Sequence, residues 1–252
     1  EDCGFKELSL PASLCDIYMN AFAYCKNLVK VDLSKTNVKE IGCFANCYAL
    51  EEVRFPQNLT GIGYECFKGC SSIVTLNLPS SLLTLSGKDF LGMSSLTEIN
   101  LSNTKIKGIS DACFKDCSSL QKVVFPKSLE SINNSAFENA TALKQVDLSN
   151  TTVHNISTSS FAGCRSLEQV SLAENTDTIG NLAFSGCSNL AEVRNTNHVK
   201  IVFDGAFEGT KLFDAVQNGP VMIGSVLYQY KGTIEDKEYS VPETVTCIAA
   251  KA

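Results

Sequence analysis

The feature that most constrains this chain is a phenylalanine that recurs every 22 to 24 residues along most of its length. Around it lies a repeated unit, of which residues 106–126 (IKGISDACFKDCSSLQKVVFP) are a complete example. A unit of this size cannot bury its own apolar side chains, so neighbouring units must stack and share one core. The pattern therefore predicts a solenoid with one such ring per coil: Phe22, Phe44, Phe67, Phe90, Phe114, Phe137, Phe161, Phe184 and Phe207.

Each unit also contains a short stretch with the spacing expected of a β-strand. In the example unit the apolar positions are Leu120, Val123 and Phe125. Alternate side chains of a strand share one side, so Val123 and Phe125 point into the core together. One strand per coil predicts a continuous parallel sheet along one side of the solenoid. The equivalent positions are Leu28/Val31/Leu33, Leu50/Val53/Phe55, Ile73/Leu76/Leu78, Leu96/Ile99/Leu101, Leu143/Val146/Leu148 and Leu167/Val170/Leu172.

Two kinds of turn follow the strand. In one kind proline fixes φ at the exit, as at Pro56, Pro79 and Pro126. In the other kind hydroxyl and amide side chains can bond nearby backbone, as in Leu-Ser-x-Thr at residues 33–36, 101–104 and 148–151. The second kind carries one extra residue, which explains the spacing of 24 from Phe90 to Phe114 and from Phe137 to Phe161.

The repeated phenylalanine is expected in a brief helical turn opposite the sheet, because residues such as Ser110-Asp111 before it are good helix N-caps. Two residues after it stands a type that tolerates left-handed backbone in every unit except that of Tyr24. We therefore predict a left-handed residue that ends each helical turn. These residues are Tyr24, Asn46, Gly69, Gly92, Asp116, Asn139, Gly163, Gly186 and Gly209.

The unbroken repeat argues for a single domain over residues 1–252. Regular repeats are expected over about 1–215, and the segments 221–232 and 238–241 indicate β-hairpin material, an insertion over 216–241. The repeat resumes over 242–252 and stops one residue before the next phenylalanine position. At the start of the chain we expect either that residues precede residue 1 or that the first strand is itself the cap, and at the end we expect a longer protein beyond residue 252.

Charge argues against nucleic acid as a partner, and hydropathy argues against a membrane-spanning segment. The net charge of −6, the pI near 5.1 and the lack of a Lys/Arg cluster argue against nucleic-acid binding. No apolar run reaches the ~18 residues that a membrane span requires. No basic segment followed by an apolar one opens the chain, so any signal peptide is outside it.

The twelve cysteines first suggest a metal or disulfide framework. Cys43/Cys47, Cys66/Cys70 and Cys113/Cys117 share a C-x3-C spacing, and Cys25, Cys164 and Cys187 fill the second position alone. In other units that position holds Met93, Ala140 or Thr210, which a zinc site would not accept but a packed interior would. We therefore predict no metal and free, buried thiols in this slot. Cys3, Cys15 and Cys247 fall outside it and are the candidates for exposure or oxidation.

The sequence contains no motif that indicates an enzyme. The only histidines, His154 and His198, lie at variable loop positions, and no nucleophile, zinc-protease, phosphate or calcium motif is present. We therefore expect no catalytic residue and no cofactor.

The run P-x-x-L-x-x-I-x-x-x-A-F-x-x-C-x-x-L-x-x-V resembles the BspA-like, or Treponema-type, leucine-rich repeats. It is read at Pro126, Leu129, Ile132, Ala136, Phe137, Leu143 and Val146, with Cys117, Cys164 or Cys187 showing the cysteine position. The VLYQYK stretch at residues 226–231 is similar to a hairpin found between repeats of that family. The resemblance implies an α/β leucine-rich-repeat solenoid with a parallel β-sheet on the concave face, short helical turns opposite and an irregular β-hairpin near the C-terminus. It also implies a secreted or cell-surface location.

Family members include adhesins for host extracellular-matrix proteins or other microbes, so the resemblance implies adhesion to a protein or glycan ligand. The alternative is a structural spacer, a stalk that binds nothing. Binding residues would lie at the variable, outward-facing strand positions, which are polar, of mixed sign and free of aromatics. A solvated face without a ligand fits these positions equally well. The candidates are Lys30, Asp32, Glu52, Arg54, Asn77, Glu98, Asn100, Lys122, Gln145, Asp147, Gln169, Glu192 and Arg194.

Overall fold

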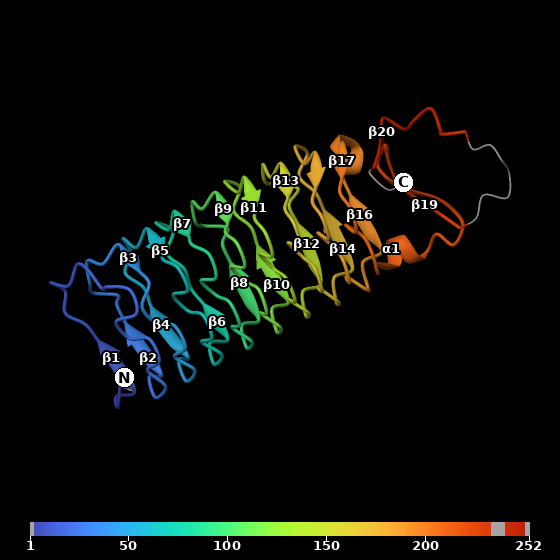
Figure 1. Ribbon diagram of the computed structural model, residues 1–252. Coiled ribbons are helices and arrows are strands. Elements are labelled where there is room, and N and C mark those ends of the chain that lie inside the picture. The colour runs from blue at the N-terminus through green and yellow to red at the C-terminus, as the bar shows by residue number, and fades with distance from the viewer. Residues whose placement is uncertain (1–2, 233–239, 250–252) are drawn as a thin grey trace.

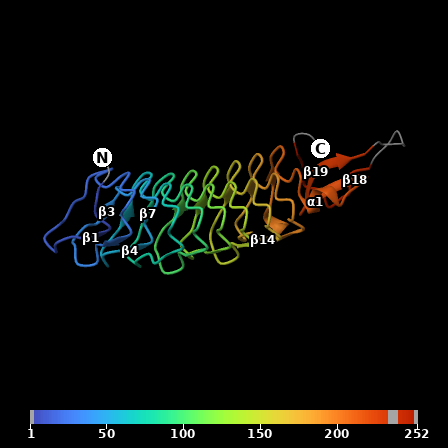
Figure 2. The same cartoon turned by 90° about the horizontal axis from the view of Figure 1, so that it is seen from below.

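The computed structural model describes residues 3–232 and 240–249. Figure 1 shows an elongated rod of stacked coils with two columns of strands, and Figure 2 shows that its axis is nearly straight. The first column, which we call the primary face, consists of β1 (Glu7–Ser9), β2 (Lys30–Asp32), β4 (Glu52–Arg54), β6 (Thr75–Leu76), β8 (Glu98–Asn100), β10 (Lys122–Val124), β12 (Gln145–Asp147), β14 (Gln169–Ser171) and β16 (Glu192–Arg194). The second, the secondary face, consists of β3 (Glu40–Ile41), β5 (Gly61–Ile62), β7 (Thr84–Leu85), β9 (Gly108–Ile109), β11 (Ser131–Ile132), β13 (Asn155–Ile156), β15 (Thr178–Ile179) and β17 (Ile201–Val202).

Paired strands on the primary face run parallel, one per coil, with equivalent residues opposite each other. Val31 of β2 lies opposite Val53 of β4, and Val146 of β12 lies opposite Val170 of β14. These central residues are buried while their neighbours face outward, as the alternation of the sequence predicts. The predicted solenoid with parallel strands is therefore confirmed.

The secondary face corrects the expectation of helical turns opposite the sheet. That side carries its own parallel strands, in which Ile41 lies opposite Ile62 and Ile132 opposite Ile156. In the described residues the helices are a four-residue α1 (Lys211–Asp214) and a three-residue 3-10 turn, η1 (Thr196–His198). The chain is thus a β-solenoid with little helix.

The segment around each repeated phenylalanine is a turn whose backbone bonds to the next coil. The N–H of Phe114 donates to the carbonyl of Ala136 at 2.7 Å, and the N–H of Asp116 donates to Glu138 at 2.8 Å. A helix would require these donors to bond within the same turn. Because they are used between coils, the segment extends the ladder of stacked coils and does not form a helix.

The left-handed residue predicted two positions after each phenylalanine is confirmed in all nine units, including that of Tyr24 at φ 63°. A second left-handed position, two residues before the phenylalanine, was not predicted. Most of its occupants, such as Glu65, Lys88 and Leu182, are residue types with no preference for that conformation. The full set is Asn20, Glu65, Lys88, Ala112, Ser135, Ser159, Leu182 and Gly205.

The nine phenylalanine rings form one continuous stack inside the rod. Successive ring centroids are 4.9 to 6.1 Å apart and successive planes differ by at most 16°. From Phe44 to Phe207 each ring is fully buried. These eight rings are the largest fully buried side chains of the described residues, so each contributes a large apolar area to the shared core. We call this column the spine.

The primary face is divided, whereas a continuous sheet was expected. Strands β1, β2 and β4 form one sheet, β6, β8 and β10 a second, and β12, β14 and β16 a third. The two strands that precede the divisions, β4 and β10, are followed by Phe55-Pro56 and Phe125-Pro126. The remaining primary-face strands are followed by leucine or asparagine at this position. The bulk of phenylalanine at the strand exit therefore coincides with each interruption.

The C-terminal region is a mixed sheet that covers the end of the spine. Strands β18 (Gly219–Ile223) and β19 (Val226–Lys231) are antiparallel, and β20 (Cys247–Ile248) pairs parallel with β19. The ring of Tyr228 meets Phe207 edge-on with centroids 5.7 Å apart. The hairpin turns between Ile223 and Val226, earlier than the sequence suggested. The strand expected at 238–241 and the end of the resumed repeat lie partly outside the described residues, and the division at residues 216 and 241 stays a prediction.

At the opposite end a disulfide joins Cys3 to Cys25. Cys3 was a candidate for exposure or oxidation, whereas Cys25 was expected to be a free thiol of the buried slot. The bond links the first described coil to the second, where β1 pairs with β2. Of the remaining described cysteines, Cys15 is exposed, Cys247 is partly buried, and the eight others are buried and free.

Candidate binding surface

Most charged residues predicted on the primary face pair with one another. Glu52 receives Arg54 Nε at 2.8 Å and Lys30 Nζ at 3.4 Å, Lys122 Nζ lies 3.0 Å from Glu98, and Arg194 Nε lies 2.8 Å from Glu192. Hydrogen bonds and charge from the arginine hold the pKa of Glu52 and of Glu192 below the usual value. Exposed pairs of this kind contribute little to stability. The ion pairs do neutralise charges that would otherwise be available to a charged ligand.

Three other predicted residues hold the long turns. Asp32, Asn100 and Asp147, each the last residue of its strand, accept from the backbone N–H and the hydroxyl of the serine two positions later. At Asp147 the two distances to Ser149 are 3.0 and 2.7 Å. The bonds from Ser34 lower the pKa of Asp32. These side chains therefore have a structural role in the Leu-Ser-x-Thr turn.

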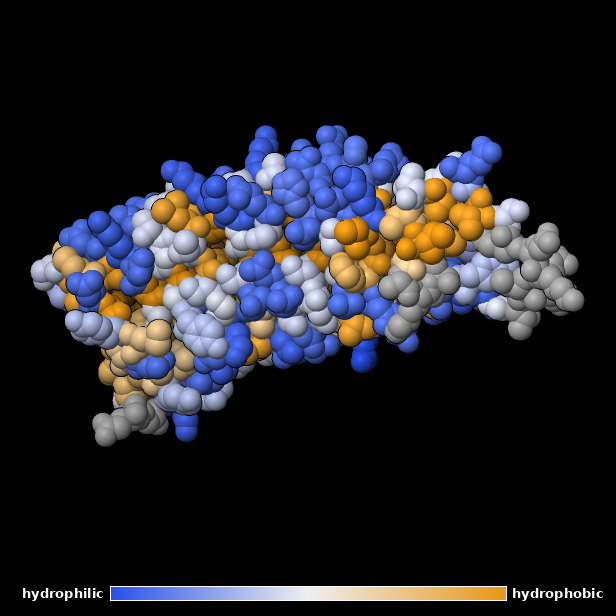
Figure 3. All heavy atoms as spheres, turned by 45° about the horizontal axis from the view of Figure 1, so that its top comes forward, coloured by the Kyte–Doolittle hydropathy of each residue, from blue (hydrophilic) through white to orange (hydrophobic). Residues whose placement is uncertain are grey.

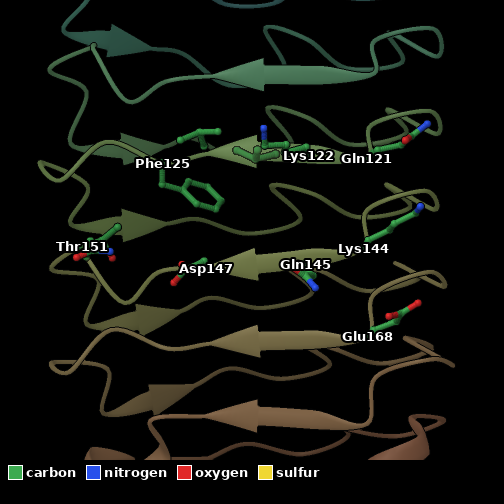
Figure 4. A pocket seen from close by; sticks show the side chains of 11 residues that line it. Gln121, Lys122, Phe125, Lys144, Gln145, Asp147, Thr151 and Glu168 are labelled. Atoms are coloured by element: carbon green, nitrogen blue, oxygen red, sulfur yellow. The ribbon is translucent and has the colours of Figure 1, made fainter.

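A groove opens on the primary face between β10 and β12, with a volume of about 630 Å³. We call it the central groove. In Figure 4 the ring of Phe125 is directed from the end of β10 toward the coil of β12, with Gln145 and Asp147 on β12. Val124 and Phe125 are partly exposed and give the groove an apolar floor. The lining residues are Gln121, Lys122, Val123, Val124, Phe125, Lys144, Gln145, Asp147, Asn150, Thr151 and Glu168.

The local sequence explains the groove. Phe125 turns its ring edge-on against Phe137, the spine residue of the next coil. The coil of Phe125 also has the short proline turn, whereas the coils before and after it have long turns at residues 101–104 and 148–151. A short turn between two long ones leaves a notch, which Asn150 and Thr151 border.

The structure brings together three of the predicted residues, Lys122, Gln145 and Asp147, in the central groove. Lys30, Asp32, Glu52 and Arg54 border a smaller hollow of about 290 Å³ near the first coils. The remaining six, Asn77, Glu98, Asn100, Gln169, Glu192 and Arg194, line neither hollow. Sequence reasoning missed Lys144 and Glu168, which directly precede a strand, and placed Phe125 wholly inside. The Phe-Pro sequence directly after β10 was the signal from which the position of Phe125 could have been predicted.

The cysteine slot is explained by a hydrogen bond. The thiol of Cys117 donates to the carbonyl of Phe90 in the preceding coil at 3.1 Å, and Cys47, Cys70, Cys164 and Cys187 repeat this contact. Burial raises the pKa of Cys117 to about 12 and that of Cys47 to about 11. Within residues 3–232 and 240–249, no three histidine, cysteine or acidic side chains are grouped to hold a metal ion.

The surface is mainly hydrophilic on the side shown in Figure 3, with a band of hydrophobic residues along the rod and a further patch toward the C-terminal end.

Among the helices of the described residues, none is long and apolar enough to cross a membrane.

Comparison with known proteins agrees with the repeat pattern. The model of the BspA type leucine rich repeat region, which contains six copies of the repeat, matches residues 1–118 and 107–230. No curated protein matches the chain. Among solved structures, a leucine rich repeat protein of T. pallidum is 25% identical, with 73% of this chain and 78% of that chain covered and a TM-score of 0.52.

A second similar structure is a leucine rich cell surface protein from Faecalibacterium prausnitzii. It is 18% identical, with 81% of this chain and 79% of that chain covered, and has a TM-score of 0.51. At this identity the likeness shows the fold alone. The family match extends over most of the chain and agrees with the spine and the parallel strands described above. The chain belongs to the BspA-type leucine-rich-repeat family.

Proposed function

We propose that this chain is the binding part of a cell-surface or secreted bacterial protein that adheres to a protein or glycan ligand through the central groove. Host extracellular-matrix proteins are the expected partners, and the activity is non-enzymatic. Family membership supports the surface location, and the geometry of the groove supports the position of the contact. The proposal narrows the candidate surface from the whole primary face to the division between β10 and β12.

The observation that carries the proposal is the contrast between the groove and the rest of the face. Elsewhere on the face charged side chains pair within a strand, as Arg194 does with Glu192, or between neighbouring strands, as Lys30 does with Glu52. In the groove, Val124 and Phe125 expose apolar surface, and Lys144 has no ion pair among the described residues. Protein interfaces typically combine a partly apolar centre with a polar rim. A ligand would therefore gain more binding free energy from contact with the groove than from contact with the rest of the primary face.

Binding of the purified chain to immobilised matrix proteins and to a glycan array tests this proposal. We expect saturable binding to at least one of them. Lys144→Glu and Val124→Asp should each weaken it by at least about tenfold, the effect of one hot-spot residue. Lys200→Glu, a matched charge reversal at an exposed position beside β17 on the secondary face, should leave it unchanged. Saturable binding that all three variants retain would show that the groove is not the contact site.

The spacer remains the second candidate because of the paired charges. Eight of the thirteen predicted residues are joined in ion pairs on the primary face: Lys30, Asp32, Glu52, Arg54, Glu98, Lys122, Glu192 and Arg194. A rod with a self-compensated surface is suited to holding another domain away from the cell. A spacer predicts no saturable binding to any immobilised ligand, and an adhesive domain elsewhere in the protein.

A further inference from the structure

A second hollow lies on the secondary face at the first coils, far along the rod from the central groove. We call it the N-terminal pocket. Its volume is about 690 Å³, within the range of small-molecule sites. It is lined by Cys15, Asp16, Ile17, Tyr18, Asn37, Lys39, Glu40, Asn58 and Thr60. These residues come from three successive coils, the middle one containing β3.

Hydrogen bonds between coils fix the walls of this pocket. Asn37 donates from its backbone N–H to Leu14 and from its side-chain amide to Ala12, both at 2.9 Å. On the other side, the hydroxyl of Thr60 donates to the carbonyl of Lys39 at 3.1 Å. The segment before Tyr18 is thereby attached to the coil of β3, and that coil to the next. The pocket is preformed, so a ligand need not order it.

One wall is an aromatic ring left almost bare. Tyr18 is 85% exposed, the highest value among the large hydrophobic residues that the structure describes. The adjacent coil is short, with two fewer residues between Ile41 and Phe44 than between Ile62 and Phe67 in the next coil. It also lacks the left-handed residue that precedes the spine phenylalanine in the other coils. Less chain is therefore available beside Tyr18 to cover its ring.

The remaining lining supplies hydrogen-bonding groups at several points. The carboxylates of Asp16 and Glu40 accept, the ammonium of Lys39 donates, and the amide of Asn58 does both. Ile17 is the only aliphatic side chain in the lining. A protein hot spot would need more apolar surface than this. A sugar ring needs one flat apolar wall for its C–H face and several polar groups for its hydroxyls, and this pocket offers both.

We propose that the N-terminal pocket binds a neutral sugar residue, with the ring stacked on Tyr18 and its hydroxyls bonded by Asp16, Glu40 and Asn58. Two carboxylates against one ammonium disfavour an acidic sugar, because a third negative charge would be repelled. The site is separate from the central groove, so the two proposals stand or fall independently.

Cys15 provides a built-in reporter for this site. It lines the pocket and is exposed, whereas Cys247 is partly buried and the other free thiols of the described residues are buried. Alkylation of Cys15 by iodoacetamide, followed peptide by peptide with mass spectrometry, measures access to the pocket. Cys247 serves as the internal reference in the same sample.

The test measures alkylation of Cys15 in the presence of four neutral sugars, glucose, galactose, mannose and N-acetylglucosamine, and of two acidic sugars, glucuronate and sialic acid. A glycan array measures direct binding. At least one neutral sugar should slow the alkylation of Cys15 several-fold and saturably, without effect on Cys247 and with no such effect from the acidic sugars. Tyr18→Ala should abolish the protection, Tyr18→Phe should retain it because the ring remains, and Lys144→Glu in the central groove should leave it intact.

Three results would overturn the proposal. One is that no sugar protects Cys15 and no neutral glycan on the array binds. A second is that protection persists in Tyr18→Ala. The third is that acidic sugars protect better than neutral ones. Because Tyr18 is exposed, its substitution should not unfold the chain, and a thermal melt of Tyr18→Ala checks this directly.

Discussion

The ring of Phe125 meets the spine ring of Phe137 edge-on, with centroids 6.0 Å apart and planes at 87°. Phe55 meets Phe67 in the same way, at 6.0 Å and 89°. Both rings belong to the residue directly after a strand and contact the spine of the following coil, and in both places the sheet of the primary face is divided. At the equivalent Leu78, also followed by proline, β6 and β8 remain paired. Side-chain size at the strand exit, rather than the proline, accounts for the division.

Phe125→Leu should therefore close the division between β10 and β12. The smaller side chain removes the edge-on contact, so that the two strands can approach and form ladder hydrogen bonds, each worth about 1 kcal/mol. Loss of apolar area offsets part of this gain, so we expect stability to change by less than about 1.5 kcal/mol. Hydrogen exchange should slow at residues 145–147, and a crystal structure should show a smaller groove. Unchanged exchange at residues 145–147 would argue against the ring of Phe125 as the cause of the division.

The spine predicts where substitutions are most costly. Phe114→Ala removes a fully buried ring stacked on both neighbours and should lower the free energy of unfolding by about 3–5 kcal/mol. His154→Ala changes an exposed side chain and should cost less than about 0.5 kcal/mol. Urea unfolding followed by circular dichroism compares the two variants. Equal midpoints would mean that the stacked rings do not hold the coils together.

The repeat could be predicted from the sequence because its signals are local and recur. The phenylalanine spacing located the spine, and the alternation at Val123 and Phe125 located the primary-face strands. The secondary face was missed because its strands are two residues long and show no alternation. Glycine, asparagine and aspartate two positions after phenylalanine pointed to left-handed backbone, whereas Glu65 and Lys88 two positions before it gave no such signal.

The candidate site was harder to predict because it depends on contacts between coils. The positions expected to face outward are exposed or partly exposed. Which of them pair, as Arg54 does with Glu52, could not be predicted from the sequence. The groove itself results from one ring orientation and from the order of short and long turns along the rod. No single unit contains that information. The N-terminal pocket likewise depends on the short coil beside Tyr18.

Thiol reactivity should separate two classes of cysteine. Ellman's reagent reacts with thiolates, and burial both shields the slot cysteines and raises their pKa, to about 12 for Cys117 and Cys43. In the folded protein at pH 8 we expect fast reaction at Cys15 and slower reaction at Cys247, with the buried thiols reacting only after unfolding in urea. Rapid native labelling of Cys117, identified by mass spectrometry, would contradict the packed slot.

The spine region contains one buried acid, Asp89, in the position directly before Phe90. Alanine fills the equivalent position as Ala136, and cysteine fills it as Cys66 and Cys113 in the coils on either side. The backbone N–H of Ser86 donates to Oδ2 of Asp89 at 2.6 Å, but Oδ1 has no hydrogen-bond partner. Burial raises the pKa of this carboxyl from 3.8 to about 9. At neutral pH the folded chain therefore holds a proton on Asp89 that the unfolded chain releases.

This proton makes stability fall as pH rises. Between the unfolded pKa of 3.8 and the folded pKa of about 9, the folded state binds more protons, so each unit of pH weakens it by up to about 1.4 kcal/mol. Asp89→Ala removes this pH-dependent contribution. The free energy of unfolding of Asp89→Ala, relative to that of the natural chain, should therefore increase from pH 5 to pH 8. Glu174→Ala, which changes an exposed acid, should show no such growth. Urea unfolding at both pH values measures the difference, and parallel pH profiles for the natural chain and Asp89→Ala would show that the buried carboxyl is already ionised at pH 5.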